Sequence, residues 1–455
     1  MRSVPAVERS ACTQLLTAPP RPPTTSQCPE RSPILVRRPS TSPSSPDGAP
    51  EPLQPVDVAI EGECNLTTAT VTRNSMRDDR SWPGAPTAVA EFHRRMPAYE
   101  PTLLFDAPRL AAGLGIGRLL IKAETRRMGL PSFKVLGASW ATYRAICTHM
   151  GREPGRWENI NDLATEIAHL KPFKLVTATD GNHGRAVAFM ARLLGFEAEI
   201  FVPAGMARAR IEAMESEGAT VTSVAGDYDH AVARSSREAG DRCLVVSDTS
   251  WPGYEATPSD VIDGYSTIFD EIDHALDATG LSQPDLVVVP MGVGALMAAA
   301  VTHYRGEHRV STVLAGVEPL DANCVQTSAL AGVPMDVPGP HGSIMVGLNC
   351  GMPSRVAWPR LATGVDWFVA VDDDAACRAM RDLAEAAVVA GETGAASLAG
   401  LRALLADRSA NDALPDLGDK TALVIVTEGA TDPAAYRRIV GRDIDSVGRV
   451  VTAIR

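Results

Sequence analysis

Short apolar runs alternate with longer stretches of helical periodicity through most of the chain, and this alternation limits the folds open to it. Strand patterns that are repeatedly followed by helix patterns favour an α/β protein with a largely parallel sheet. The runs that predict strands are 119–123, 175–178, 199–202, 220–224, 243–246, 286–289, 313–317 and 422–426. The stretches that predict helices are 137–150, 184–194, 207–217, 228–239, 260–278 and 374–390.

The first 85 residues do not share this pattern. They contain one aromatic residue, Trp82, and no lysine, and 13 of the chain's 34 prolines lie in the first 60 positions. Such a composition buries too little apolar surface to offset the entropy lost when a chain becomes ordered. We therefore expect residues 1–85 to be a disordered Pro/Ser-rich tail that the chemistry does not need. A later translation start, for example at Met76, is the alternative.

Charge and cysteine usage exclude several functional classes. Lys and Arg number 43 against 55 Asp and Glu, and the net charge of −12 argues against binding to nucleic acid or an anionic membrane. The longest uncharged apolar run, 286–302, is too short and too interrupted by proline and glycine to span a membrane. The eight cysteines and nine histidines are scattered. We therefore expect no metal site and a cytoplasmic location.

Lys134 lies in the stretch S-F-K-V-L-G-A (132–138), between a loop and the start of a predicted helix. Its neighbours Phe133, Val135 and Leu136 are apolar, and we expect this setting to lower the pKa of the lysine and make its amine nucleophilic. A nucleophilic amine is what Schiff-base formation with an aldehyde requires. Considered by itself, such a lysine is more often simply exposed.

Two glycine-containing junctions each join a predicted strand to a helical stretch: T-A-T-D-G-N-H-G-R (177–185) precedes 184–194, and P-M-G-V-G-A-L (290–296) precedes a helical pattern at 296–304. Glycines let the backbone approach a ligand, and a helix N-terminus presents free N–H groups to an anion. Asn182 adds a hydrogen-bond donor and an acceptor, although a turn capped by Asp180 is an equally good interpretation of the first junction. The second junction suits a phosphate. It lacks the third glycine of the dinucleotide fingerprint, which argues against NAD.

A third junction, T-E-G-A-T-D (427–432), follows the strand predicted at 422–426. Polar residues just beyond the carboxyl end of a parallel strand lie where α/β enzymes place their ligands. Thr427 is suited to bind a ring nitrogen, and ordinary turn chemistry explains it equally well.

The order of these motifs resembles that of pyridoxal-phosphate enzymes with the tryptophan-synthase-β fold (fold type II) and, among them, the diaminopropionate ammonia-lyases. The motifs are S-F-K-x-L-G-A, D-G-N-H-G, G-x-G after a strand, and a terminal T-E-G-x-T-D. Further stretches that match are D-T-S-W-P-G-Y (248–254), D-G-Y-S-T (263–267), S-I-M-V-G-L-N-C-G (343–351) and G-E-T-G (391–394). The resemblance covers about residues 86–440.

The resemblance implies a role for each residue that matches. Lys134 would bond the aldehyde of pyridoxal 5'-phosphate, Asn182 would hold the phenolic oxygen of this cofactor, and Thr427 would face its pyridine nitrogen. Asp180 and Asp248 match positions at which the family carries acid–base carboxylates. The residues that would bind the phosphate are Gly292, Val293, Gly294 and Ala295.

The implied activity is the α,β-elimination of 2,3-diaminopropionate to pyruvate and two ammonia. Related serine and threonine dehydratases carry a serine at the place of Asp180, so this residue separates the subclasses. A dehydratase, or another β-eliminating or β-replacing enzyme of the same fold, is the alternative. A non-catalytic, cofactor-binding regulator is disfavoured because it would need no acid–base residues.

The resemblance also implies two domains and a homodimer that acts on a small amino acid. The larger domain would combine 86–135 with 250–455, and the smaller domain, 136–249, would close over the site. Cys324 and Cys350 lie in segments that both match near the phosphate side. We predict that these segments are neighbours and that the two thiols can pair under oxidation. Two unrelated buried cysteines are the alternative.

Overall fold

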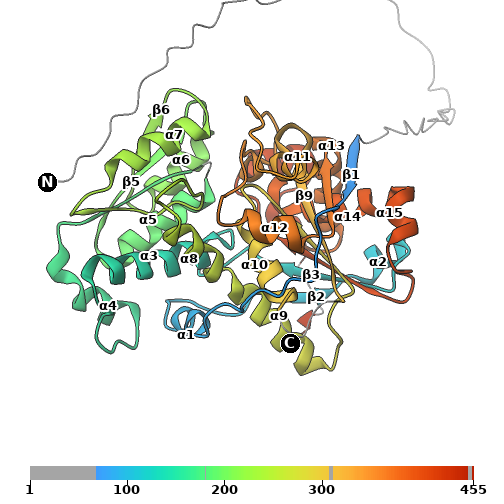
Figure 1. The fold of residues 1–455 in the computed structure, drawn as a ribbon, viewed down its shortest axis with the longest axis horizontal. Helices are drawn as coiled ribbons and strands as arrows, with labels where there is room; N and C mark the ends of the chain where they lie inside the picture. The colour runs from blue at the N-terminus through green and yellow to red at the C-terminus, as the bar shows by residue number, and fades with distance from the viewer. Residues whose placement is uncertain (1–67, 180, 307–310, 449–452, 455) are drawn as a thin grey trace, which may run out of the picture. The chain divides into compact units, whose positions relative to one another are not determined.

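The structure is a computed structural model that describes residues 68–179, 181–306, 311–448 and 453–454. The described residues belong to one compact unit. Its strands build an eight-stranded sheet in the order β1-β10-β9-β8-β11-β3-β2-β12 and a four-stranded sheet in the order β6-β5-β4-β7 (Figure 1).

The strands are β1 (Ala69–Arg73), β2 (Leu104–Asp106), β3 (Arg118–Ala123), β4 (Lys174–Ala178), β5 (Glu197–Pro203), β6 (Thr220–Val224), β7 (Cys243–Val245), β8 (Leu286–Pro290), β9 (Val313–Pro319), β10 (Trp367–Val371), β11 (Thr421–Val426) and β12 (Ala453–Ile454). The α-helices are α1 (Ala88–Arg94), α2 (Pro108–Leu114), α3 (Lys134–Met150), α4 (Ile160–Glu166), α5 (Asn182–Leu194), α6 (Arg208–Glu215), α7 (Tyr228–Ser235), α8 (Ala256–Gly264), α9 (Ser266–Thr279), α10 (Ala295–Tyr304), α11 (Cys324–Ala331), α12 (Trp358–Gly364), α13 (Asp373–Glu385), α14 (Glu392–Ala406), α15 (Arg408–Ala413) and α16 (Pro433–Val440).

The centre of the eight-stranded sheet is parallel, from β10 through β9, β8 and β11 to β3. Every residue of β8 is buried. Val287 and Val289 belong to one apolar cluster, whereas Leu286 and Val288 belong to another, so both faces of this strand are covered. This explains why β8 reads as a continuous apolar run, because a strand buried on both faces has no alternation of polar and apolar residues.

The four-stranded sheet is parallel throughout. Helices α5 and α7 both pack against β4 and β5, and these elements lie together in the green part of the chain (Figure 1). Helix α5 carries one strongly apolar face, with Val187, Met190 and Leu194 fully buried. The start of this helix is therefore fixed by the packing of its body. Within the part of the chain that is described, no helix is long and apolar enough to cross a membrane.

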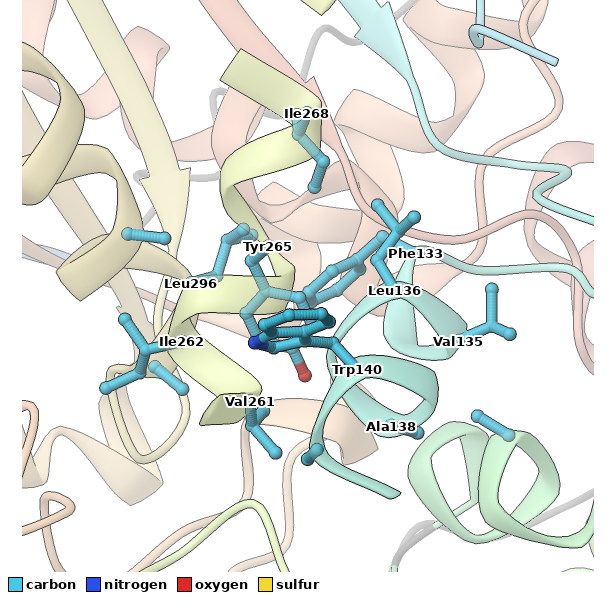
Figure 2. Close-up of a cluster of buried hydrophobic side chains, with 14 of the residues drawn as sticks. Phe133, Val135, Leu136, Ala138, Trp140, Val261, Ile262, Tyr265, Ile268 and Leu296 are labelled. Atoms are coloured by element: carbon cyan, nitrogen blue, oxygen red, sulfur yellow. The ribbon is translucent and has the colours of Figure 1, made fainter. Parts of the chain in front are cut away.

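Helix α3 packs closely against α8, because each contributes a glycine to the contact. A Cβ atom on Gly137 would lie 2.5 Å from Cε1 of Tyr265, and one on Gly264 would lie 2.6 Å from the carbonyl oxygen of Leu136. Tyr265 directly follows α8, and its ring centroid lies 4.7 Å from that of Phe133. Figure 2 shows Tyr265 among the apolar side chains of both helices. This packing fixes the first turn of α3, where Lys134 lies.

The eight predicted strands are all confirmed, as β3 to β9 and β11. The helix predicted at 260–278 is instead two helices, α8 and α9, with Tyr265 between them. Strands β1, β2, β10 and β12 were not predicted from the sequence. Strands β2 and β12 have three residues and two residues, which is too short for a periodic pattern to be recognised.

The expectation that residues 1–85 are a disordered tail is wrong for residues 68–85. Strand β1 pairs antiparallel with β10, from Ala69 opposite Val371 to Arg73 opposite Trp367. The buried amide of Asn74 then donates hydrogen bonds to the carbonyl oxygens of Ala362, at 2.9 Å, and of Val365, at 2.6 Å. These long-range contacts order a segment whose own composition is unfavourable. The rest of the predicted tail, residues 1–67, lies outside the described residues.

The division into two domains stays a prediction. The four-stranded sheet lies wholly within the predicted smaller domain, 136–249, whereas the eight-stranded sheet draws its strands from both sides of that range. Helix α3 nevertheless contacts α8 from the larger domain and α5 from the smaller one.

Candidate active site

A pocket of about 810 Å³, counting its part open to solvent, lies where several parallel strands end. Its lining includes Pro290 at the end of β8, Thr427 after β11, Thr179 after β4 and Asp248 after β7. In open α/β sheets, ligands bind outside the carboxyl ends of the strands. The two sheets thus bring residues from distant parts of the sequence to one cavity.

Lys134 and Asp248 form an ion pair in this pocket. Lys134 Nζ lies 2.6 Å from Asp248 Oδ2, and the two side chains are 21% and 9% exposed. The phenol of Tyr228, at the start of α7, donates to the other carboxylate oxygen at 3.2 Å. The structure therefore brings together the lysine and one of the carboxylates that the sequence analysis selected.

The expected lowering of the Lys134 pKa is wrong in sign. Burial is the largest single effect and acts in that direction, but the Asp248 carboxylate and smaller contributions from other neighbours together raise the pKa of Lys134 above its ordinary value. In the same way, burial would raise the pKa of Asp248, but Lys134 holds this pKa below its ordinary range. The apolar neighbours in the sequence give no sign of this partner, because Asp248 is 114 residues away.

His183 lies behind the ion pair. Its Nε2 lies 2.8 Å from the carbonyl oxygen of Val246, and burial lowers its pKa, so a neutral imidazole would donate from Nε2. Its Nδ1 lies 3.9 Å from Asp248 Oδ2 and has no hydrogen-bond partner among the described residues. Because His183 is neutral, it does not compete as a cation with Lys134 for the Asp248 carboxylate.

The predicted phosphate-binding residues also line the pocket, at the junction of β8 and α10. Gly294 has φ +92, and a Cβ atom there would lie 2.3 Å from Cδ1 of Leu361. Only glycine fits such a position without strain. The N-terminus of α10 begins at Ala295, so its free N–H groups and the positive end of its dipole favour an anion. Gly292, Val293 and Ala295 line the same pocket.

Asn182 and Thr427 also line the pocket, as predicted. The amide of Asn182 donates to the carboxylate of Glu428, and the Thr427 hydroxyl lies 3.4 Å from the carbonyl oxygen of Thr393. Asp180 lies outside the described residues, so its role stays a prediction. The capping of α5 is partly explained without it, because the Thr179 hydroxyl accepts the N–H groups of Gly181 at 2.9 Å and Gly184 at 3.0 Å.

The pocket also contains residues that were not selected as site residues from the sequence, among them Glu428, Thr393, Tyr228 and Tyr265. Glu428 and Thr393 belong to motifs that the sequence analysis quoted, T-E-G and G-E-T-G. The motifs could therefore be recognised in the sequence, but the sequence did not show which residue of each motif faces the cavity. Tyr228 lies in no motif, and it reaches Asp248 only because α7 packs on the four-stranded sheet.

Cys324 and Cys350 lie in neighbouring segments, which confirms that part of the prediction. Cys324 Sγ lies 4.0 Å from the carbonyl oxygen of Gly292, and a Cβ atom on Gly292 would lie 3.0 Å from Cys350 Sγ. The cysteines among the described residues form no disulfide, and pairing of these two under oxidation stays a prediction. Within the same residues, no cluster of His, Cys, Asp and Glu is arranged to hold a metal ion.

Comparison with known proteins places the chain among characterised enzymes. The family described as pyridoxal-phosphate dependent enzyme matches residues 95–428. The diaminopropionate ammonia-lyase of Escherichia coli K12 is 32% identical over 365 residues, which are 77% of this chain and 89% of that protein. The L-threonine dehydratase of Mycobacterium bovis is 27% identical over 280 residues, which are 60% of each protein.

Solved structures agree with this placement. The crystal structure of holo diaminopropionate ammonia lyase from Escherichia coli superposes with a TM-score of 0.74 and 30% identity. The alignment covers 82% of this chain and 97% of that one.

The pocket fits pyridoxal phosphate on its own geometry. It offers an amine on Lys134, the glycine-containing turn 292–294 along its lining, and a helix N-terminus for a phosphate. Since the family matches most of the chain and the Escherichia coli enzyme is similar over nearly its whole length, the chain belongs to the pyridoxal-phosphate dependent enzymes of fold type II and, among them, to the diaminopropionate ammonia-lyase family.

Proposed function

We propose that the chain catalyses the α,β-elimination of 2,3-diaminopropionate, giving pyruvate and two ammonia. The observation that carries this proposal is the Lys134–Asp248 ion pair, with 2.6 Å between Nζ and Oδ2, in the pocket of a chain of this family. An elimination that expels an amine needs a group that removes the Cα proton and a group that protonates the leaving amine. A lysine and a carboxylate in contact can meet both needs.

Each pocket residue has a proposed task. When bound, pyridoxal phosphate stabilises the electron pair left at Cα after the proton departs. Lys134 holds the cofactor through Nζ and afterwards carries a proton on the same atom, next to the charge of Asp248. The backbone from Gly292 to Ala295 binds the phosphate. Asn182 and Thr427 bind the two ends of the ring, at its phenolic oxygen and its nitrogen.

Asp180 and Asp248 are the proposed acid–base carboxylates. Acidic side chains in the pocket also suit a substrate that carries a second ammonium group, by charge complementarity. Inversion at Cα moves the Cα proton to the other face of the cofactor, so Lys134 and a base on the opposite face could each serve one enantiomer. Asp180, directly before Gly181 and Asn182, is the proposed base for the D-isomer.

The proposal is tested by measuring pyruvate and ammonia from both enantiomers of 2,3-diaminopropionate, with L-serine and L-threonine in parallel. We expect turnover of diaminopropionate to exceed that of the two hydroxy amino acids. Preferential formation of pyruvate from serine, or of 2-oxobutanoate from threonine, would instead identify a dehydratase. Borohydride should trap the cofactor on Lys134, and Lys134→Ala should abolish both the trapping and the turnover. Cofactor trapped on another lysine would contradict the assignment.

We further propose a cytoplasmic homodimer. The cysteines are scattered along the sequence and those among the described residues form no disulfide, which is consistent with a reducing compartment. Light scattering of the purified chain at several concentrations tests the dimer, and a mass of 48.1 kDa at all of them would contradict it.

A further inference from the structure

Glu428 connects the two sheets across the pocket. It follows β11 of the eight-stranded sheet, whereas Asn182 begins α5, which packs on the four-stranded sheet. The Asn182 amide nitrogen donates a hydrogen bond to Glu428 Oε2. Because 246 residues separate the two positions, this contact joins parts of the fold that are otherwise distant in the sequence.

The carboxylate of Glu428 is held in place by its surroundings. Glu428 is only 2% exposed, and its Oε1 accepts the N–H of Thr393 at 3.2 Å. Its backbone carbonyl oxygen accepts the N–H of Gly391 at 3.1 Å. Gly391 and Thr393 belong to the segment that begins α14. These contacts hold Glu428 on the side of the eight-stranded sheet independently of Asn182.

A fixed carboxylate decides which way the Asn182 carboxamide points. A carboxamide has an accepting oxygen and a nitrogen with two N–H groups, and a carboxylate can only accept. The nitrogen of Asn182 must therefore face Glu428. One N–H is used there, and the second N–H of the same nitrogen is left for another acceptor, as the proposed contact with a phenolic oxygen requires.

Glu428 also contacts the segment that leads to Lys134. It pairs with Ser132 in an isolated antiparallel bridge, and the N–H of Gly429 donates to the carbonyl oxygen of Pro131 at 2.9 Å. Lys134 comes two residues after Ser132. Glu428 and Gly429 thus contact both the segment that carries Lys134 and the side chain of Asn182.

We propose that Glu428 is a positioning residue that orients the Asn182 carboxamide toward the cofactor. This inference rests on the proposed function of the site. Glu428 does not act on the reacting atoms; its effect passes through Asn182. Because a hydrogen bond to a charged group is lost, we expect the loss of this contact to weaken cofactor binding about 10-fold.

The test uses the full chain, titrated with pyridoxal phosphate, in four forms: wild type, Glu428→Gln, Asn182→Asp, and the double variant with both changes. The double variant exchanges donor and acceptor, since the introduced glutamine would donate to the introduced aspartate. Three quantities are measured: the dissociation constant of the cofactor, its visible absorption spectrum, and the melting temperature without cofactor. Glu392→Gln is the matched control, because Glu392 is also buried and interacts electrostatically with Glu428.

We expect Glu428→Gln to raise the dissociation constant about 10-fold and to shift the visible spectrum, since the phenolic oxygen loses an oriented donor. The double variant should regain the melting temperature but not the cofactor affinity or the spectrum. An unchanged affinity and spectrum in Glu428→Gln would overturn the proposal. Recovery of all three quantities in the double variant would also overturn it, because the hydrogen bond would then matter but not the direction in which Asn182 donates. An equal loss of affinity in Glu392→Gln would overturn it too, because the loss would then follow from the removal of a negative charge.

Two further measurements keep the test decisive. If Glu428→Gln does not fold, Glu428→Asp retains the charge but shortens the side chain by one methylene, and unchanged cofactor affinity and spectrum in that variant would contradict the proposal. A wild-type chain that binds the cofactor but forms no pyruvate from diaminopropionate would contradict the proposed function, and the Glu428 measurements would still decide the role of Glu428.

Discussion

Lys134 Nζ lies 2.6 Å from Asp248 Oδ2, and this contact joins the first turn of α3 to the loop after β7. The contact raises the pKa of Lys134 and lowers that of Asp248, so both groups are charged at neutral pH. The stability that the pair contributes is lost only in strong acid, as the pH falls through the lowered pKa of Asp248, or in strong alkali, as it rises through the raised pKa of Lys134. Between these limits, the pair keeps Lys134 protonated whenever its amine is free.

Asp248→Asn should change two rates in opposite directions: the rate at which Lys134 bonds pyridoxal phosphate (cofactor capture) and the rate of turnover. Without the carboxylate, burial lowers the pKa of Lys134, so more of its amine is neutral at pH 7 and capture of pyridoxal phosphate becomes faster. Turnover should fall by about 100-fold or more because an acid–base group is lost. Absorbance measurements of capture between pH 6 and 10, with a pyruvate assay, test both effects. Tyr228→Phe, which removes only the hydroxyl bonded to Asp248, is the control, and slower capture at pH 7 in Asp248→Asn would contradict the prediction.

Asp180→Asn should discriminate between the two enantiomers of the substrate. Asparagine caps a helix about as well as aspartate but accepts no proton. We expect a folded, cofactor-loaded protein that loses turnover of the D-isomer far more than that of the L-isomer. Separate steady-state assays of each isomer provide the measurement. Near-wild-type activity on both isomers would reduce Asp180 to a structural residue.

Glu318→Gln should change how stability depends on pH. Glu318 is fully buried, and burial raises its pKa to about 8 although the N–H groups of Val325 and Gln326 donate to it at 2.8 Å. The folded chain therefore keeps a proton that the unfolded chain loses near pH 4.3, and the free energy of unfolding falls by about 1.4 kcal/mol per pH unit from there to about pH 8. The variant should lack this slope.

Denaturant unfolding at pH 5, 6.5 and 8 measures the slope in both proteins. Glu197→Gln, at the exposed start of β5, is the matched control and should behave like the wild type. Equal slopes in Glu318→Gln and the wild type would show that Glu318 is already ionised in the folded chain.

Gly137→Ala should affect Lys134 indirectly, through Tyr265. The new methyl group would lie 2.5 Å from Cε1 of Tyr265, which packs beside Lys134. We expect a loss of about 1–3 kcal/mol in the free energy of unfolding, together with a change in the visible spectrum of the bound cofactor. Gly113→Ala, where the methyl group meets no atom within 4 Å, is the control and should be neutral or slightly stabilising. Wild-type stability of Gly137→Ala would mean that α3 and α8 can move apart at no cost.

Removal of the N-terminal segment should have different effects at two starting points. A chain that begins at Thr68 keeps β1 and the buried Asn74 amide, and we expect it to keep the wild-type melting temperature and turnover. A chain that begins at Trp82 loses both features and should melt at least about 5 °C lower. Differential scanning calorimetry of the two chains tests this, and equal melting temperatures would show that β1 contributes nothing.

The sequence by itself determined the features that depend on neighbouring residues. Apolar runs predicted the eight strands from β3 to β9 and β11. The pattern is clearest in β8, because a strand buried on both faces of a parallel sheet is apolar along its length. The glycines at 292 and 294 and the stretch around Lys134 indicated the site for the same reason, since close backbone approach and a helix start are local properties.

Only the tertiary structure decided which distant residues face one another. The sign of the Lys134 pKa shift depends on Asp248, the orientation of Asn182 depends on Glu428, and the order of residues 69–73 depends on β10. Each of these contacts spans more than 100 residues. Electrostatic and hydrogen-bond energies depend on distances in space, and these distances are set by how the two sheets pack, which no local pattern of residues encodes.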